Sequence, residues 1–193
     1  VWMGCTIHSG DREFGVPDEY PLEAAGCRID ENGKKYIRVK GVRWYTNIDH
    51  GRRHDPRPLM SMSANIRYSK HKEIKGKGYL HYDNFDAIEV PYSDAIPCDY
   101  EGMIGVPITF FDKYCPEQFE IVGITQSWFG MASKIYPKQI QVSKMGKKTT
   151  VTKLNDGAAI ELPGPDEGEV YYIVDGHYYT KAYARILIRK KQS

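Results

Sequence analysis

Three short glycine-containing stretches, each set between segments rich in β-branched and aromatic residues, constrain most strongly how this chain can fold. They are Asn32-Gly33, Met145-Gly146-Lys147 and Asp175-Gly176. Such stretches supply the positive φ that a tight β-hairpin turn demands. Few segments carry a sustained helical period, and only residues 59–69 and 109–119 favour short helical turns. The sequence therefore predicts an α+β, β-rich fold with long loops.

The composition is that of an ordinary globular protein. Of the 193 residues, 41% are hydrophobic and 27% are charged, which suits one domain, or one domain with an added lobe. No apolar run approaches the roughly 18–20 residues of a membrane-spanning helix, and the opening VWMGCTI is typical of a strand interior rather than of a signal peptide. The four cysteines form no CxxC pair, as expected of reduced thiols. We expect a cytoplasmic protein with no membrane partner, preceded by further sequence.

Charge is balanced over the whole chain and strongly uneven within it. The formal net charge is +2, yet residues 34–77 hold 13 Lys and Arg against 3 Asp and Glu, a local charge of +10. Residues 83–120 hold 1 against 9, a local charge of −8. A polyanion responds to local potential, so the basic block predicts nucleic-acid binding. The alternative is that the two blocks pack together and neutralise each other.

Motifs for catalysis and metal binding are missing from this sequence. It contains no GxGxxG, Walker loop, GxSxG or HExxH, and the carboxylates of residues 83–120 are spaced as turn and surface groups without a distinct catalytic pair. His50 and His54 are four residues apart, but the intervening Arg52 and Arg53 would repel a cation. We therefore predict no catalytic residue and no metal site.

What remains is a basic stretch interleaved with aromatic residues. Lys and Arg neutralise phosphates and release counterions, whereas Asn and other amphipathic donors can reach base edges. Trp44 lies within an alternating strand and is predicted to be a core residue rather than a stacking platform. The predicted phosphate contacts are Arg43, Arg52, Arg53, Lys70, Lys72, Lys75 and Lys77, and the predicted base-edge contacts are Asn47, His54 and His71.

Three runs carry a resemblance to a known family. The runs at residues 9–54 (SGDREFG…DHGRRH), 81–123 (HYDNFDA…FEIVG) and 178–191 (YYTKAYARILIRKK) occur in collinear order and resemble the EcoRI family of DNA adenine-N6 methyltransferases. The resemblance implies S-adenosylmethionine as the methyl donor, a flipped adenine in duplex DNA as the substrate, and a Rossmann-like catalytic sheet with added recognition elements.

The chain departs from that family at the motifs that perform the chemistry. The Asn/Asp-Pro-Pro-Tyr/Phe motif and a cofactor-binding strand–glycine loop are both missing, and the nearest string is Glu89-Val90-Pro91-Tyr92. We therefore expect residues 1–58 to be late strands of a Rossmann-like methyltransferase sheet with a long excursion, and residues 59–193 to be a β-rich target-recognition region. The expected partners are double-stranded DNA and a missing N-terminal catalytic half. S-adenosylmethionine would serve the full-length enzyme and would not bind this chain alone.

Two alternatives of other classes remain open. One is a stand-alone nucleic-acid-binding module without catalytic activity. The other is a protein-interaction domain whose acidic block docks a basic partner and whose basic block is only solvated.

Overall fold

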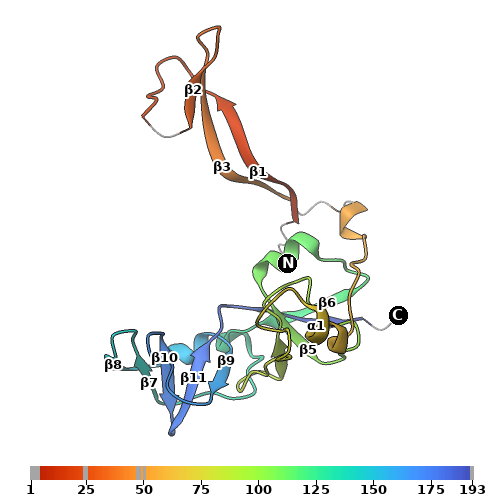
Figure 1. Cartoon of the computed structure of the whole chain (residues 1–193), viewed down its shortest axis with the longest axis vertical. Helices are drawn as coiled ribbons and strands as arrows, with labels where there is room; N and C mark the ends of the chain where they lie inside the picture. Colours follow the sequence, from red (N-terminus) through yellow and green to blue (C-terminus); the bar gives the residue numbers. More distant parts are fainter. Residues whose placement is uncertain (1–4, 24–25, 47–48, 50, 192–193) are drawn as a thin grey trace. The chain divides into compact units, whose positions relative to one another are not determined.

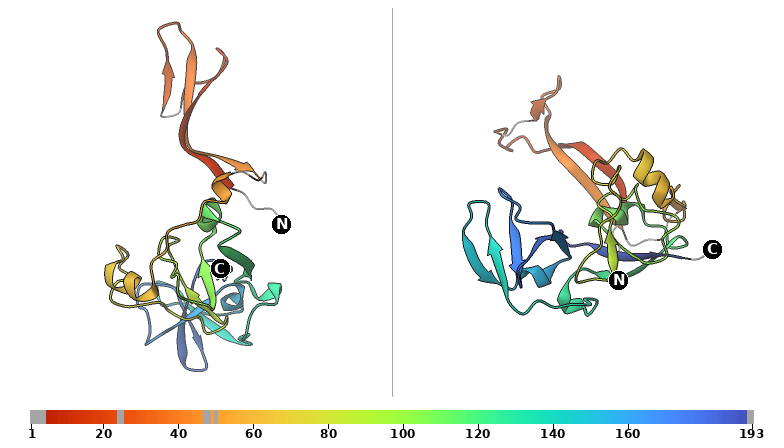
Figure 2. Two further views of the ribbon diagram at one scale, coloured as in Figure 1. Left: turned by 90° about the vertical axis from the view of Figure 1, so that its right-hand side faces the viewer. Right: turned by 60° about the horizontal axis from the view of Figure 1, so that its bottom comes forward.

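The structure of the chain is β-rich, as predicted. The computed structural model describes residues 5–23, 26–46, 49 and 51–191, with the backbone alone for residues 5–9, 43–46 and 52. The chain forms two compact units, one of residues 1–50 with 111–113 and the other of residues 51–110 with 114–193. Figures 1 and 2 show the elements of each unit. None of the helices in these ranges is long and apolar enough to cross a membrane.

The first unit is built on a three-stranded antiparallel sheet in the order β1-β3-β2. Its strands are β1 (Cys5–Gly15), β2 (Cys27–Ile29) and β3 (Lys35–Thr46). The predicted hairpin between β2 and β3 is confirmed: Gly33 has φ 78°, and the Asp30 carboxylate accepts hydrogen bonds from the backbone N–H groups of Asn32 and Lys34, each at 2.9 Å. A Rossmann-like sheet is not confirmed, because the described strands of this unit pair only with one another and only antiparallel.

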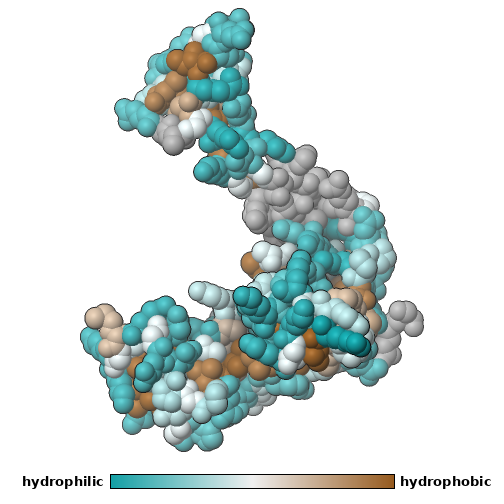
Figure 3. Space-filling view, viewed as in Figure 1, coloured by the Kyte–Doolittle hydropathy of each residue, from teal (hydrophilic) through white to brown (hydrophobic). Residues whose placement is uncertain are grey.

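The two faces of this sheet differ in chemistry. One face carries the ion pairs Arg28–Glu13 and Arg38–Asp11, at 2.7 and 2.8 Å. The other face carries apolar side chains, since Phe14 and Cys27 both pair with Ile37 across the strands. Hydrophobic side chains are visible on this unit in Figure 3. No residue of range 10–49 with a described side chain is buried, so this unit has no closed core among those residues.

The second unit holds two sheets. The four-stranded sheet has the order β4-β5-β12-β6, with β4 parallel to β5 and the other pairs antiparallel. The five-stranded sheet is antiparallel, in the order β8-β7-β10-β11-β9. The strands are β4 (Ala87–Glu89), β5 (Met103–Val106), β6 (Phe119–Ile124), β7 (Gln139–Val142), β8 (Lys148–Val151), β9 (Ala159–Leu162), β10 (Tyr171–Val174), β11 (His177–Lys181) and β12 (Ile186–Lys190).

Short helices precede or connect these strands. The α-helix α1 (Met62–Tyr68) lies within the segment predicted to be weakly amphipathic, and it begins where the Ser61 hydroxyl accepts a hydrogen bond from the Ala64 N–H at 3.1 Å. The 3₁₀ helices are η1 (Gly51–Arg53), η2 (Ile108–Lys113), η3 (Ser127–Phe129) and η4 (Lys153–Asp156). The helix predicted within residues 109–119 is thus 3₁₀ only and ends before Pro116, which cannot donate to an α-helical bond.

Two glycine turns of the second unit confirm the predicted hairpins. Gly146 has φ 76° between β7 and β8, and Asp175 and Gly176 have φ 49° and 87° between β10 and β11. Positive φ at both central residues matches the tight turn that the right-handed twist of two strands favours.

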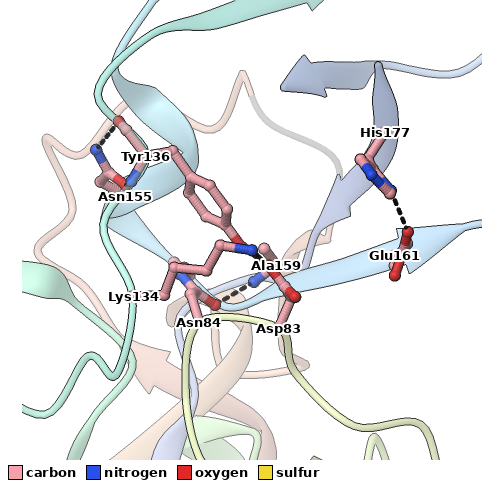
Figure 4. A network of polar contacts seen from close by, with 9 residues as sticks. Asp83, Asn84, Lys134, Tyr136, Asn155, Ala159, Glu161 and His177 are labelled. Atoms are coloured by element: carbon pink, nitrogen blue, oxygen red, sulfur yellow. Dashed lines mark hydrogen bonds and ion pairs between the residues drawn. The ribbon is translucent and has the colours of Figure 1, made fainter. Parts of the chain in front are cut away.

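A polar network joins the two sheets of this unit (Figure 4). The Asn84 side chain donates to the Gly157 carbonyl at 2.9 Å and accepts from the Ala159 N–H at 2.7 Å. Asp83 accepts hydrogen bonds from Lys134 and from the Tyr136 hydroxyl, each at 2.6 Å. Burial opposes ionisation of Asp83, but these donors outweigh it and lower the pKa of the carboxyl. The network fixes the start of β9 against residues 82–87 of the core.

A buried ion pair lies within the four-stranded sheet. The Arg185 guanidinium contacts both oxygens of Glu89, with Nη2 at 2.6 Å from Oε1, and the Tyr82 hydroxyl donates to the same carboxylate. Only 13% of the Arg185 side chain and 9% of the Glu89 side chain are exposed. The expectation that the carboxylates of residues 83–120 are surface groups is therefore wrong for Glu89, because a sequence does not show which distant arginine can pair with it.

Candidate nucleic-acid interface

The segment that follows α1, residues 69–78, holds most of the predicted contacts that the structure describes. Its backbone is fixed by local hydrogen bonds, including Lys75 N–H to His71 O at 2.9 Å and Gly76 N–H to Ile66 O at 2.8 Å. Ile74 is 1% exposed and anchors the segment in the core. Gly76 and Gly78 have φ 74° and 88°, a region that strongly favours glycine. The segment is thus a tight, anchored loop and not an extended tail.

Three lysines project from this loop into solvent. Lys72, Lys75 and Lys77 are exposed, and none of them takes part in an ion pair within the part of the chain that the structure describes. Lysine on a fixed backbone pays less conformational entropy when it meets a phosphate than lysine on a disordered tail. Among the predicted phosphate contacts whose side chains the structure describes, these three lysines are exposed and have no ion pair with another described residue.

Lys70 and His71 are held by the acidic block instead. Both contact Asp94, with Lys70 Nζ at 2.9 Å from Oδ2 and His71 Nε2 at 2.8 Å from Oδ1, and the His71 ring stacks on Tyr92 at a centroid distance of 3.6 Å. Burial opposes ionisation of Asp94, but the hydrogen bonds from Lys70 and His71 outweigh it and lower the pKa of this carboxyl to about 2. For these two residues the basic and acidic blocks do neutralise each other.

The predicted contacts of residues 43–54 are described in part. Asn47 lies outside the described residues, and Arg43 in β3 and Arg52 in η1 are described by their backbones alone. Trp44, the predicted core residue, is likewise described by its backbone alone. Arg53 is half-buried. His54 is exposed, and its Nδ1 lies 2.5 Å from Oε1 of Glu117. The hydrogen bond from His54 is the main cause that lowers the pKa of the Glu117 carboxyl.

A second basic element escaped the sequence reasoning. The hairpin β7–β8 and its flanks, residues 138–153, contain five lysines and neither Asp nor Glu. Its charge becomes visible in a short sliding window, whereas the larger basic block at residues 34–77 dominates longer ones. The five residues are Lys138, Lys144, Lys147, Lys148 and Lys153.

No candidate metal site is found in the described ranges. They hold no group of three or more His, Cys, Asp or Glu able to bind a metal ion, and His50 lies outside them. A nucleotide-like cofactor is usually held where a glycine-containing loop runs from a strand into a helix. Residues 54–61, which precede α1, contain two prolines and no glycine. The segment that leads into α1 therefore lacks such a glycine-containing loop.

Comparison with known proteins identifies the family. The model of the adenine-specific methyltransferase EcoRI family matches residues 1–191. The chain belongs to this family.

Three relatives are named as Type II methyltransferases. M.EcoRI of Escherichia coli is 39% identical over 122 residues, which is 63% of this chain and 35% of that protein. M.MgeORF184P of Mycoplasma genitalium is 27% identical over 194 residues, covering 100% of this chain and 50% of that protein. M.MpnI of Mycoplasma pneumoniae is 27% identical over 124 residues, covering 63% and 36%. The chain thus spans half or less of these relatives' lengths, and no solved structure matches it.

Proposed function

We propose that this chain is the DNA-binding, target-recognition part of an S-adenosylmethionine-dependent, site-specific adenine-N6 methyltransferase of a restriction–modification system. The observation that carries the proposal is the anchored loop at residues 69–78 in a member of an adenine-specific methyltransferase family. It presents Lys72, Lys75 and Lys77 to solvent without acidic partners among the described residues.

In this proposal the lysines of the loop hold the phosphate backbone of a duplex. Contacts of this kind fix register and orientation, whereas base edges carry the sequence information. Lys70 and His71 position the loop by fixing it to Asp94, and in this proposal they contact DNA only at the margin of the interface. Arg43, Arg52 and Arg53 remain proposed phosphate contacts, and Asn47 and His54 remain proposed base-edge contacts.

The methyl transfer itself is assigned to a catalytic part other than the described residues. Residues 1–58 would complete the methyltransferase sheet and residues 59–193 would position duplex DNA, so that the target adenine can leave the stack. S-adenosylmethionine would supply the methyl group in that other part. The contribution of this chain is to bind and orient the duplex, and we propose that it does so in the cytoplasm.

Salt dependence of DNA binding tests the proposal. Affinity of the full 193-residue chain for a duplex is measured by fluorescence anisotropy across a salt series, for the wild type and for Lys72→Gln/Lys75→Gln/Lys77→Gln. Each phosphate contact contributes about 0.9 to the slope of log K against log salt concentration, so the triple variant should lose about 2.7. Lys190→Gln/Lys191→Gln is the control, because these lysines line a cleft together with Asp99, Glu101 and Glu120.

Two results would count against the proposal. Absence of duplex binding by the wild type at low salt would refute it for this chain. A triple variant that keeps the wild-type slope would remove the loop from the interface and with it the observation on which the proposal rests.

A further inference from the structure

The hairpin β7–β8 concentrates positive charge at a free edge of the five-stranded sheet. Strand β8 is the edge strand, next to β7 alone, and every residue from Lys144 to Thr150 is exposed. That run contains three lysines and two threonines and no acidic residue. An edge strand also presents unpaired backbone N–H groups, which can donate to an anion.

The tip of this hairpin has a defined conformation. The Ser143 N–H donates to the Lys147 carbonyl at 3.0 Å, and the Lys147 N–H donates to the Ser143 hydroxyl at 3.1 Å. Gly146 takes the positive φ of the turn, and Met145 at the tip is 94% exposed. Lys147 and Lys148 therefore leave a backbone that is already ordered.

The side of the hairpin that faces the protein is anchored in the core. The buried Gln139 side chain donates to the Tyr136 carbonyl at 3.1 Å and accepts from the Leu154 N–H at 2.8 Å. Val142 is 3% exposed, and Val151 packs against the cluster that contains Leu154. One side of the hairpin thus packs against the core of the second unit, while Lys147 and Lys148 remain exposed to solvent.

The acidic residue that pairs with this hairpin, Glu169, lies on the side away from β8. Lys144 pairs with Glu169 at 2.8 Å, and Glu169 precedes β10, which adjoins β7 on the side opposite to β8. Lys147 and Lys148 have no ion pair within the part of the chain that the structure describes. The free positive charge is consequently at the β8 edge.

We propose that the β8 edge is a second DNA-contacting surface, at which Lys147 and Lys148 bind phosphates of the duplex backbone. This inference rests on the proposed function and extends it to an element outside the basic block of residues 34–77. A duplex carries one negative charge per roughly 1.7 Å of axis, so two adjacent exposed lysines, Lys147 at the end of the turn and Lys148 at the start of β8, can each meet a phosphate.

Lysine on an edge strand can instead prevent pairing between sheets of two molecules. That role accounts for a lysine within β8. It does not account for Lys138, Lys144, Lys147 and Lys153, which lie outside the strand. Nor does it require that residues 138–153 lack every acidic residue, because charged side chains of either sign can protect an edge.

The test compares Lys147→Gln/Lys148→Gln with Lys190→Gln/Lys191→Gln in the full chain, again by duplex binding across a salt series. Each variant replaces two neighbouring lysines by glutamine, and circular dichroism checks that the fold is kept. The β8 variant should lose about 1.8 from the salt slope, and the control should lose nothing measurable. That pattern supports the proposal.

Other outcomes overturn it in distinguishable ways. If the wild type binds DNA and the β8 variant keeps the full slope, the inference fails and the proposed function stands. If the β8 variant keeps the slope but self-associates in sedimentation velocity runs, the lysines protect the edge and the inference also fails. If the wild type does not bind duplex DNA at low salt, both fail.

Discussion

Replacing Glu89 by Gln should destabilise the second unit strongly. The Glu89 carboxylate accepts from Arg185 Nη2 at 2.6 Å and from Arg185 Nε at 3.0 Å, and it also accepts from the Tyr82 hydroxyl. Glutamine has nearly the same shape but no charge and a single acceptor oxygen. The Glu89→Gln variant would therefore leave a buried guanidinium without a counter-ion.

The size of the effect follows from burial. With 13% of the Arg185 side chain and 9% of the Glu89 side chain exposed, water cannot replace the lost partner. Removing one member of a buried pair costs roughly 3–5 kcal/mol, whereas replacing both by apolar groups is often neutral. We therefore expect Glu89→Gln to lower the free energy of unfolding by about 3–5 kcal/mol, and Glu89→Gln/Arg185→Met to be more stable than Glu89→Gln alone.

Urea-induced unfolding followed by circular dichroism measures both variants. The control is Glu120→Gln, which removes another Arg–Glu pair of the same sheet. In that pair Arg189 Nη1 lies 3.9 Å from Glu120 Oε2, and the Glu120 and Arg189 side chains are 56% and 48% exposed. Glu120→Gln should therefore leave the unfolding midpoint unchanged. A loss below about 1 kcal/mol for Glu89→Gln, or a double variant less stable than Glu89→Gln alone, would refute the reasoning.

Two further predictions concern Gly105 and Asp94. A Cβ at position 105 would overlap the Tyr82 ring, so Gly105→Ala should lower the free energy of unfolding by roughly 1–3 kcal/mol. The control is Gly164→Ala, which should not lower it, because nothing lies within 4 Å of a Cβ at position 164. Equal stability of the two variants would contradict this prediction. The pKa of Asp94 is lowered from 3.8 to about 2, so its contribution to stability is present above pH 3.8 and is lost as the pH falls through about 2. NMR titration of the carboxyl measures this, and a midpoint near 3.8 would show that Lys70 and His71 do not hold it.

The turns of this fold could be predicted from the sequence because they depend on local backbone chemistry. Gly33, Gly146 and the pair Asp175-Gly176 all adopt the positive φ that their residue types favour. The weak helix at α1 was also predictable, since Ser61 provides a cap and the apolar spacing is local. Each of these features is decided within a few residues, where tertiary context has little influence.

The partners of charged residues could not be predicted, because they depend on contacts between distant segments. Glu89 meets Arg185 across 96 positions of sequence, and His54 meets Glu117 across 63. Asp94 holds Lys70 and His71 because the turn at residues 91–95 packs beside the loop that follows α1. Counting the charged residues of a sequence segment treats all of these residues alike, although the structure divides them into residues with an ion-pair partner and residues that are solvated.

That division decides which basic residues can bind a polyanion. A lysine already paired with a carboxylate must break that pair to neutralise a phosphate, so its net gain is small even where the local charge is high. Lys70 is in this class through Asp94, and Lys144 through Glu169. Lys72, Lys75, Lys77, Lys147 and Lys148 pair with no carboxylate among the described residues, and all five belong to the same compact unit. Because one unit carries both lysine groups, a single duplex that contacts both should lose the sum of the two contributions to the salt slope when both groups are replaced. Such additivity would indicate a shared interface and would not be expected of two unrelated solvated patches.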